Sequence, residues 1–318
     1  MAGTVAADVW IVGRGESYAE LRMLGDELGG RGLRAEVVDW DGLTPSCEPP
    51  GALRADGGFQ VPRLAVIGSM VFTRQPAAGL ADLQAALGLL EDGGARLVNP
   101  AASLAAYRNK LRQTAALAAA GLPVPPTRAA RSVAQVSACV AEWGDVVVKP
   151  SYGHASVDVL RLRPGVHGGE VPGGLGRRSG ILVWHLLDRH GVLCVQRFVT
   201  NPGRDLRLVV LGGRVAACYY HVSTAPDGDT HHPLYPFRWE RAERKPEIEE
   251  LALRAVAVLG FDVASLDLLE GPDGPVVVEV NPSVSAWASV ERTEYDRTPD
   301  GITRAYADLL CERLAERA

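Results

Sequence analysis

Three oxygen-bearing side chains lie within two apolar segments near the C-terminal end of the sequence. Asp267 lies in the run ASLDLL, and Glu279 and Asn281 lie in the run VVVEVN. Burying a carboxylate in a strand costs free energy unless the carboxylate is paired or bound to a metal ion. Glu279 and Asn281 are two residues apart, so they project from the same face of a β-strand.

The turn between the two runs predicts that Asp267 joins this pair. Positions 267 and 279 are symmetric about position 273, in the Gly-Pro-Asp-Gly turn at 271–274. A hairpin with an odd-length loop, residues 271–275, would therefore place the two carboxylates opposite each other. Oxygen ligands of this kind suit Mg²⁺, which binds a few carboxylates and leaves its other positions to phosphate and water. A salt-bridged or solvent-facing set on an edge strand is an equally open interpretation.

Two lysines and an Asp-x-Arg pattern are further candidates for phosphate chemistry. Lys149 ends a run of three valines and precedes a glycine-containing loop, whose N–H groups can add to its charge around a phosphate. Lys110 is a second candidate. Asp205 and Arg207 alternate onto one strand face, where they would hold a ribose hydroxyl or a phosphate, or pair with each other. Taken singly, each lysine is equally consistent with a solvated charge.

Apolar runs and turn signals predict the elements that position these groups. The first hundred residues alternate strands and helices, which favours an α/β unit with parallel strands. A single helix is expected from Ser103 to Ala120, because Ser103 can cap it and Gly121 and Pro123 end it. The expected N-terminal elements are strands at 8–12, 34–38, 63–67 and 96–98, and helices from Ser17 to about Leu28 and at 81–90.

From Asp145 onward the pattern becomes rich in strands. Gly212-Gly213 is expected to form a hairpin turn, and seven glycines between Gly165 and Gly180 predict a mobile loop. The expected elements are strands at 146–149, 157–163, 192–199, 205–211, 214–220, 262–270 and 275–280, and helices at about 178–191, at 246–259 and from about 302.

Length and composition place the chain among globular proteins with two or more packed layers or domains. Its 318 residues are 47% hydrophobic and 22% charged, and the formal net charge of −5 offers no broad basic surface. Nucleic acid is therefore not expected as a partner. We expect a cytoplasmic protein without a membrane partner, because no secretory signal and no membrane-length apolar run is visible. Five scattered cysteines predict neither a disulfide framework nor a zinc site, and a homo-oligomer is left open.

Four segments, in this order, carry a family resemblance. They are VNPAASLAAYRNKLRQTAALAAAGLPVPPT, VVVKPSYGHASVDV, VQRFVTNPGRDLRLVVLGGRVAACYY, and FDVASLDLL followed by VVVEVNPS. The set resembles the ATP-grasp superfamily, most closely its RimK type of amino-acid (often α-L-glutamate) ligases, over nearly the whole chain. The resemblance implies an α/β plus α+β fold: a pre-ATP-grasp α/β domain at 1–100, a small lid subdomain with a linker helix at 101–191, and a large subdomain with the metal site at 192–318.

The resemblance also implies roles for the candidate residues. Arg207 would stabilise an acyl phosphate, and Arg207 and Lys149 are the predicted catalytic residues. The implied nucleotide-binding residues are the phosphate-contacting Lys110 and Lys149, Gly153 and Ser156 of the phosphate-covering loop, the adenine-binding hinge Gln196, Arg197, Phe198 and Val199, and Asp205. The implied Mg²⁺ ligands, with Mn²⁺ as an alternative ion, are Asp267, Glu279 and Asn281.

The implied reaction joins a carboxylate to an amine. ATP would convert the carboxylate to an acyl phosphate, which the amine attacks with release of ADP and phosphate. The substrates would be a carboxylate and an amine belonging to an amino acid, a peptide, a small metabolite or a carrier protein.

Several positions depart from the family pattern. Ser156 and Asp158 stand where relatives usually have glycine, and Asp158 is expected to point away because a carboxylate would repel a triphosphate. Arg197 replaces an acidic hinge residue. The remaining departures, His231-His232-Pro233 and Ser283-Val284-Ser285, fall around the substrate and predict an unusual acceptor in specialised metabolism. His221, His231 and His232 would contact that acceptor or a metal, or lie solvated in loops.

Two other functions compete with the ligase. Gly13-x-Gly15 after the first strand, with Asp39 ending the second, is a partial dinucleotide-binding fingerprint of an NAD(P)-dependent oxidoreductase, but position 18 is tyrosine rather than glycine. A catalytically silent nucleotide-binding module is the second alternative, favoured by the altered glycine loop.

Overall fold

The structure, a computed structural model, describes residues 7–14, 18–54, 58–72, 77–153, 156–164, 175–224, 237–284 and 301–316. Some sequence predictions fall outside these residues. They are the helix start at Ser17, Gly15 of the first turn, most of the glycine-rich loop, His231-His232-Pro233 and Ser285. Within the described residues, no helix is both long and apolar enough to cross a membrane.

The N-terminal part is built on a parallel sheet with strand order β2-β1-β6-β7, as the alternating pattern predicts. An antiparallel sheet of β3, β4 and β5, which the sequence analysis did not predict, is inserted between β2 and β6. The elements are β1 (Val9–Gly13), α1 (Tyr18–Gly30), β2 (Ala35–Asp39), β3 (Leu43–Cys47), β4 (Pro50–Arg54), β5 (Phe59–Gln60), β6 (Leu64–Ile67), the 3₁₀ turn η2 (Ser69–Phe72), α2 (Ala77–Asp92) and β7 (Arg96–Val98).

The predicted single helix from Ser103 to Ala120 is wrong. The chain forms α3 (Ala101–Tyr107), preceded by Pro100 at its N-cap, and then α4 (Lys110–Ala119). Asn109 starts the second helix, because its side-chain oxygen accepts hydrogen bonds from the N–H groups of Leu111 and Arg112. Such capping by asparagine satisfies the first free N–H groups of a helix, and here it places Lys110 at the helix start.

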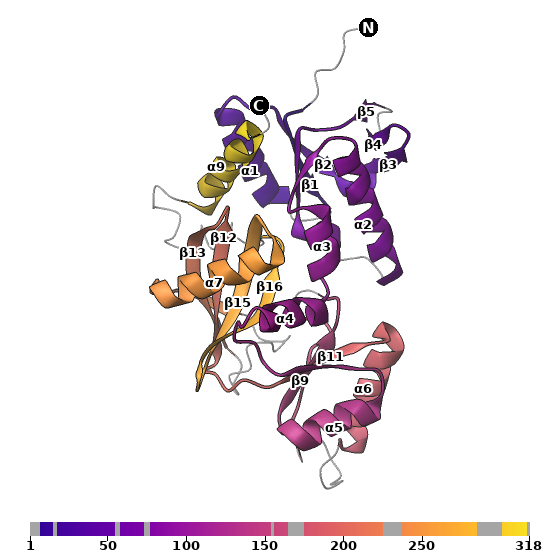
Figure 1. Ribbon diagram of the computed structural model, residues 1–318, viewed down its shortest axis with the longest axis vertical. Helices are drawn as coiled ribbons and strands as arrows, with labels where there is room; N and C mark the ends of the chain where they lie inside the picture. The colour runs from indigo at the N-terminus through magenta and orange to yellow at the C-terminus, as the bar shows by residue number, and fades with distance from the viewer. Residues whose placement is uncertain are drawn as a thin grey trace.

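The middle part is an antiparallel sheet with strand order β10-β9-β11-β8, with α5 and α6 packed side by side against it (Figure 1). The sequence analysis did not predict β8 and α5. Because β11 pairs with both β9 and β8, this unit extends to Arg197, beyond the division proposed at 191. The elements are β8 (Thr127–Ala130), α5 (Val133–Trp143), β9 (Val146–Pro150), β10 (Leu160–Leu162), α6 (Arg177–His190) and β11 (Leu193–Arg197).

The C-terminal part is a five-stranded antiparallel sheet with strand order β14-β13-β12-β15-β16. Helix α7 covers one face, and α9 returns to lie beside α1 of the N-terminal part (Figure 1). The edge strand β14 was not predicted. The elements are β12 (Arg204–Leu211), β13 (Arg214–Ser223), β14 (Phe237–Arg241), α7 (Pro246–Leu259), β15 (Val263–Gly271), β16 (Gly274–Asn281) and α9 (Ile302–Ala315).

The two faces of this sheet bury different residues of the same strands. On β12, Leu206 and Leu208 belong to the core that includes α7, whereas Val209 and Leu211 belong to the core that includes α9. Alternation along a strand therefore places Asp205 and Arg207 on the face turned away from α7. On this face, Val209 and Leu211 pack in the core that includes α9, and Asp205 and Arg207 lie at the other end of the strand.

Candidate active site

The final hairpin places Asp267 opposite Glu279, as predicted, but by a different route. The turn has two residues, because Gly271 pairs with Gly274, so the predicted five-residue loop is wrong. An irregularity in the β15–β16 pairing next to Asp267 adds one residue to β16 and shifts the register, so that Asp267 pairs with Glu279. A β-bulge of this kind re-aims the side chains beyond it.

Asp267 is held by Arg207 on the neighbouring strand β12. Nε and one terminal nitrogen of Arg207 donate to the two oxygens of Asp267 at 2.6 and 2.9 Å, and Nδ2 of Asn281 lies 3.4 Å from one of these oxygens. Burial opposes the charge of Arg207, but the Asp267 carboxylate outweighs it and raises the pKa of the guanidinium. The predicted catalytic arginine and two predicted metal ligands therefore form one contact group.

Glu279, the third predicted ligand, is held by Lys110. Nζ of Lys110 donates to Oε1 of Glu279 at 2.6 Å and to the carbonyl of Gly153 at 3.1 Å. Lys110 thus links the C-terminal hairpin to the loop after β9, and Figure 1 shows α4 between the two sheets. The chain has three lysines, and the second of them, Lys149, is also buried at this place, with 4% of its surface exposed.

Lys149 lies on β9, where the charges of the same carboxylates act on it. Within the described residues, its ammonium group donates no hydrogen bond. Burial lowers the pKa of its ammonium group, and the charges of Glu279 and Asp267 partly offset this effect. An uncompensated buried ammonium is costly. This burial agrees with the prediction that Lys149 contacts an anionic ligand, and that role stays a prediction.

Asp205 pairs with His221 directly across from it on β13. Nδ1 of His221 lies 3.0 Å from Oδ1 of Asp205, and the rings of Trp239 and Tyr219 pack on the imidazole with centroids 3.8 and 5.6 Å away. Ligating atoms of Asp205, His221 and Asp267 lie within 4.8 Å of one another. His221 is thus buried beside the predicted nucleotide site, and its solvated-loop interpretation is wrong.

The predicted adenine hinge has part of its backbone already engaged. The N–H groups of Arg197 and Phe198 donate to the carbonyls of Pro126 and Asp145, while Gln196 is buried and donates to Oγ1 of Thr127. Only the remaining N–H and carbonyl groups of the segment are available to a nucleotide. The adenine-binding role of residues 196–199 stays a prediction.

The phosphate-loop positions that lack glycine adopt glycine-like backbone. Ser156 and Asp158 have φ of 55° and 60°, in the left-handed region that side chains other than glycine disfavour. The Asp158 carboxylate contacts His190 at 2.7 Å and Arg189 at 3.1 Å on α6. It is turned toward α6, where Arg189 and His190 hold it, and its orientation away from a bound triphosphate stays a prediction.

The left-handed backbone at Ser156 predicts a stabilising substitution. We expect Ser156→Gly to raise the free energy of unfolding by up to about 1 kcal/mol, because it removes the steric cost of a Cβ at positive φ. Urea unfolding would measure the change, with Ser156→Ala as a control that keeps the Cβ and should gain nothing. Equal stability of the two variants would contradict a strained loop.

Two buried amides hold the two strands that carry the predicted metal ligands. Gln113 of α4 donates to the carbonyl of Val280 at 2.7 Å and accepts from its N–H at 2.8 Å. Asn99 does the same for Val263 on β15, at 2.7 Å for both bonds, and also donates to the carbonyl of Pro282 at 2.9 Å. The sequence analysis missed both residues, although Gln113 lies one turn after Lys110.

Gln113→Ala is expected to destabilise the protein by about 2–4 kcal/mol, because it leaves buried backbone groups without partners. The loss would be measured by urea unfolding, and hydrogen exchange at the Val280 amide should become faster. Arg112→Ala, at an exposed position of the same helix, is the control and should change the stability by less than about 0.5 kcal/mol. An unchanged exchange rate of the Val280 amide would show that the Gln113 side chain does not protect this backbone group.

The donor set of the hairpin fits a hard divalent cation. Asp267, Glu279 and Asn281 offer carboxylate and amide oxygens on one sheet face, the ligand class that Mg²⁺ binds. Each carboxylate already contacts a cationic side chain, since Arg207 pairs with Asp267 and Lys110 pairs with Glu279. A cation would therefore share these carboxylates with the arginine and the lysine.

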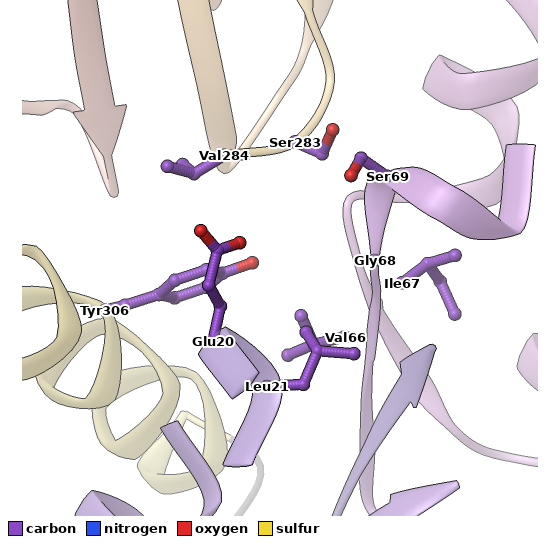
Figure 2. A pocket seen from close by; sticks show the side chains of 9 residues that line it. All are labelled: Glu20, Leu21, Val66, Ile67, Gly68, Ser69, Ser283, Val284 and Tyr306. Carbon is purple, nitrogen blue, oxygen red and sulfur yellow. The ribbon is translucent and has the colours of Figure 1, made fainter. Parts of the chain in front are cut away.

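A small pocket lies where the N-terminal part meets the end of β16. Figure 2 shows the Glu20 carboxylate beside the ring of Tyr306, and the side chains of Ser69 and Ser283 facing each other. Its volume is about 10 Å³, enough for a group the size of one water molecule. Ser283, which lines this pocket, follows the predicted metal ligand Asn281 by two residues in the chain.

Comparisons with known proteins agree with this geometry. A family model for the RimK-like ATP-grasp domain matches residues 107–297. The tetrahydromethanopterin:alpha-L-glutamate ligase of Methanosarcina acetivorans is 34% identical over 186 residues, which are 57% of this chain and 56% of that protein. Its match and those of two further ligases of the same name each span less than two thirds of the relative.

Solved structures resemble the chain along almost its whole length. D-cycloserine synthetase DcsG has a TM-score of 0.70 at 22% identity, covering 96% of this chain and 99% of DcsG. ATP-grasp ligase PsnB, complexed with a phosphomimetic variant of minimal precursor, Mg and ADP, has a TM-score of 0.68 at 20% identity, covering 97% and 99%. At these identities the likeness establishes the ATP-grasp fold, which confirms the predicted fold class.

The reported relatives are ligases, and they give no support to the oxidoreductase alternative. The matched family model covers more than half of the chain and includes every predicted site residue from Lys110 to Asn281. The chain therefore belongs to the RimK-like ATP-grasp family.

Proposed function

We propose that this protein is an ATP-dependent ligase that joins a carboxylate to an amine through an acyl phosphate, with release of ADP and phosphate. The observation that carries the proposal is the contact of Lys110 with both Glu279 and Gly153. It brings the oxygen donors of the final hairpin and the loop after β9 to the two buried lysines, an arrangement suited to a metal-bound triphosphate.

Each residue of the site would have one task in this reaction. Lys110 and Lys149 bind the phosphates of ATP, and Gly153 and Ser156 belong to the loop that covers them. Asp267, Glu279 and Asn281 would hold Mg²⁺, which when bound neutralises charge on the transferred phosphoryl group. Arg207, held in place by Asp267, donates N–H groups to the oxyanion that develops when the amine attacks. Residues 196–199 and Asp205 would border the nucleotide.

The relatives suggest amino acids and peptides as substrates. The Methanosarcina relative is named a tetrahydromethanopterin:alpha-L-glutamate ligase, and a structure of PsnB is a complex with precursor peptide PsnA2. We therefore propose that one substrate is an amino acid, with L-glutamate the first to test, and that the other is a small metabolite or a peptide. The aromatic and histidine wall of Tyr219, His221 and Trp239 would border that second substrate.

A screen for ADP release tests the proposal. The protein is incubated with ATP, Mg²⁺, L-glutamate or another amino acid, and a panel of carboxylates and amines, and new amides are detected by mass spectrometry. The expected result is ADP formation that depends on both substrates. The product should have the summed mass of the two substrates minus one water molecule. Tight MgATP binding without turnover on any pair would contradict it. A parallel series with Mn²⁺ tests the alternative ion.

A further inference from the structure

Arg108 is a cation at this site whose position the ligase chemistry has not yet explained. It lies between α3 and α4, two residues before Lys110, and its guanidinium stacks 4.0 Å from the centre of the Phe72 ring. Phe72 ends the 3₁₀ turn η2, whose first residue, Ser69, lines the pocket in Figure 2. Arg108 therefore faces the junction between the N-terminal part and the hairpin.

The guanidinium of Arg108 has no carboxylate partner among the residues that the structure describes. Its Nε is buried, and no hydrogen bond to this atom is recorded within that part of the chain. Burial lowers the pKa of Arg108 to about 10, although the charge of Glu279 acts in the opposite direction. A buried donor without a partner costs free energy, so the fold gains little from keeping an arginine here.

The charges around Glu279 are unbalanced in the described structure. Lys110 contacts this carboxylate directly, and Lys149 and Arg108 both feel its charge. The neighbouring carboxylate, Asp267, is already neutralised by Arg207. Among the described residues, one cation contacts Glu279 and two more are influenced by its charge, and this concentration of positive charge favours an anionic ligand.

The cations near this carboxylate are held by different parts of the fold. Lys110 and Lys149 contact or belong to the strand and loop of the middle sheet, where the triphosphate is proposed to lie. Arg108 is held from the N-terminal side by an aromatic ring. Stacking on a ring leaves the N–H edges of a guanidinium available in its plane, the geometry that binds a carboxylate through two hydrogen bonds.

We propose that Arg108 binds the oxyanion of the carboxylate substrate. The proposal rests on the ligase function above and assigns its carboxylate subsite. An oxyanion at Arg108 has two possible sources, the substrate or the nucleotide phosphates. The stacking on Phe72, which belongs to the N-terminal part rather than to the sheet and helix that carry the two lysines, favours the substrate.

Arg108→Met tests the assignment, because methionine keeps an unbranched apolar stem over Phe72 and removes the charge. Arg112→Met, at an exposed position in the first turn of α4, is the matched control. Binding of MgADP, and of inorganic phosphate to the MgADP complex, is followed by calorimetry and by the thermal unfolding midpoint. Inorganic phosphate serves as the probe for an oxyanion that is separate from the nucleotide.

The expected result is that Arg108→Met binds MgADP within twofold of the unsubstituted protein, loses at least tenfold in phosphate affinity, and unfolds at the same or a higher temperature. Arg108→Lys should recover part of the phosphate affinity, and Arg112→Met should change nothing. A tenfold loss of MgADP affinity would assign Arg108 to the nucleotide and overturn the proposal.

Three other outcomes would also count against the proposal or its basis. A lower unfolding temperature with unchanged phosphate binding would show that Arg108 is structural. Failure of the unsubstituted MgADP complex to bind phosphate would remove the subsite. Failure of the unsubstituted protein to bind MgADP at all would instead refute the ligase function on which the subsite rests.

Discussion

Glu279→Gln is expected to lower kcat/KM by about 10²–10³-fold, the loss typical when one preorganised electrostatic contact of a transition state is removed. Glutamine has nearly the same shape, but it lacks the charge that Lys110 contacts at 2.6 Å and that the proposed Mg²⁺ site requires. The Mg²⁺ concentration for half-maximal rate should rise as well. Steady-state kinetics over a Mg²⁺ series would measure both effects.

Glu270→Gln is the matched control for this experiment. Glu270 lies on the same hairpin and forms an ion pair with Arg204 at 2.8 Å, away from the two lysines. Its loss should leave the Mg²⁺ dependence unchanged and cost at most about 1 kcal/mol of stability. If Glu279→Gln ligates at the normal rate with the normal Mg²⁺ requirement, Glu279 is not a metal ligand.

The register of the final hairpin shows what sequence spacing can and cannot predict. The symmetric numbering of Asp267 and Glu279 predicted their pairing, and the pairing is present. The predicted cause was wrong, because the turn has two residues and a bulge in β16 adds the extra one. A bulge leaves no reliable mark in a run of valines, since its position depends on packing against both neighbouring layers.

The break between α3 and α4, just before Lys110, could have been predicted from Asn109. The continuous apolar pattern of the segment instead favoured a single helix. Asn109 is a preferred N-cap residue, yet the apolar positions from 103 to 120 continue across it as if one helix were present. Tertiary contacts decide between the two: the N–H of Lys110 donates to the carbonyl of Ser151, and its side chain contacts Glu279. Local helix propensity cannot predict contacts between residues this far apart in the sequence.

Residues that act through the backbone were also beyond the sequence analysis. Asn99 and Gln113 bind backbone atoms of Val263 and Val280, which lie more than 160 positions away. Nothing in their own neighbourhoods predicts these partners. Arg108 was missed for a related reason, because its stacking on Phe72 joins two segments whose contact only the fold creates. Strand and helix periodicity, by contrast, predicted most of the elements that carry the candidate residues.

Lys149→Met should raise the KM for ATP by about 10- to 100-fold, because a hydrogen bond to a charged group contributes about 1.5–3 kcal/mol. The same substitution should not lower the free energy of unfolding, although it weakens ATP binding. Burial lowers the pKa of Lys149, so between this lowered value and its ordinary value the unfolded chain binds more protons than the folded protein. In that window the stability of the unsubstituted protein rises with pH. Below this window both states carry the proton, and the cost of the buried charge is fully present.

Lys149→Met is therefore expected to be at least as stable as the unsubstituted protein at pH 7, with the difference shrinking as the pH approaches 10.5. Urea unfolding at pH 7 and pH 10, together with ATP titrations at pH 7, would test both parts. Lys245→Met, at the exposed start of α7, is the control and should alter neither property. Loss of stability at pH 7 with an unchanged KM for ATP would mean that Lys149 supports the fold and that the triphosphate binds elsewhere.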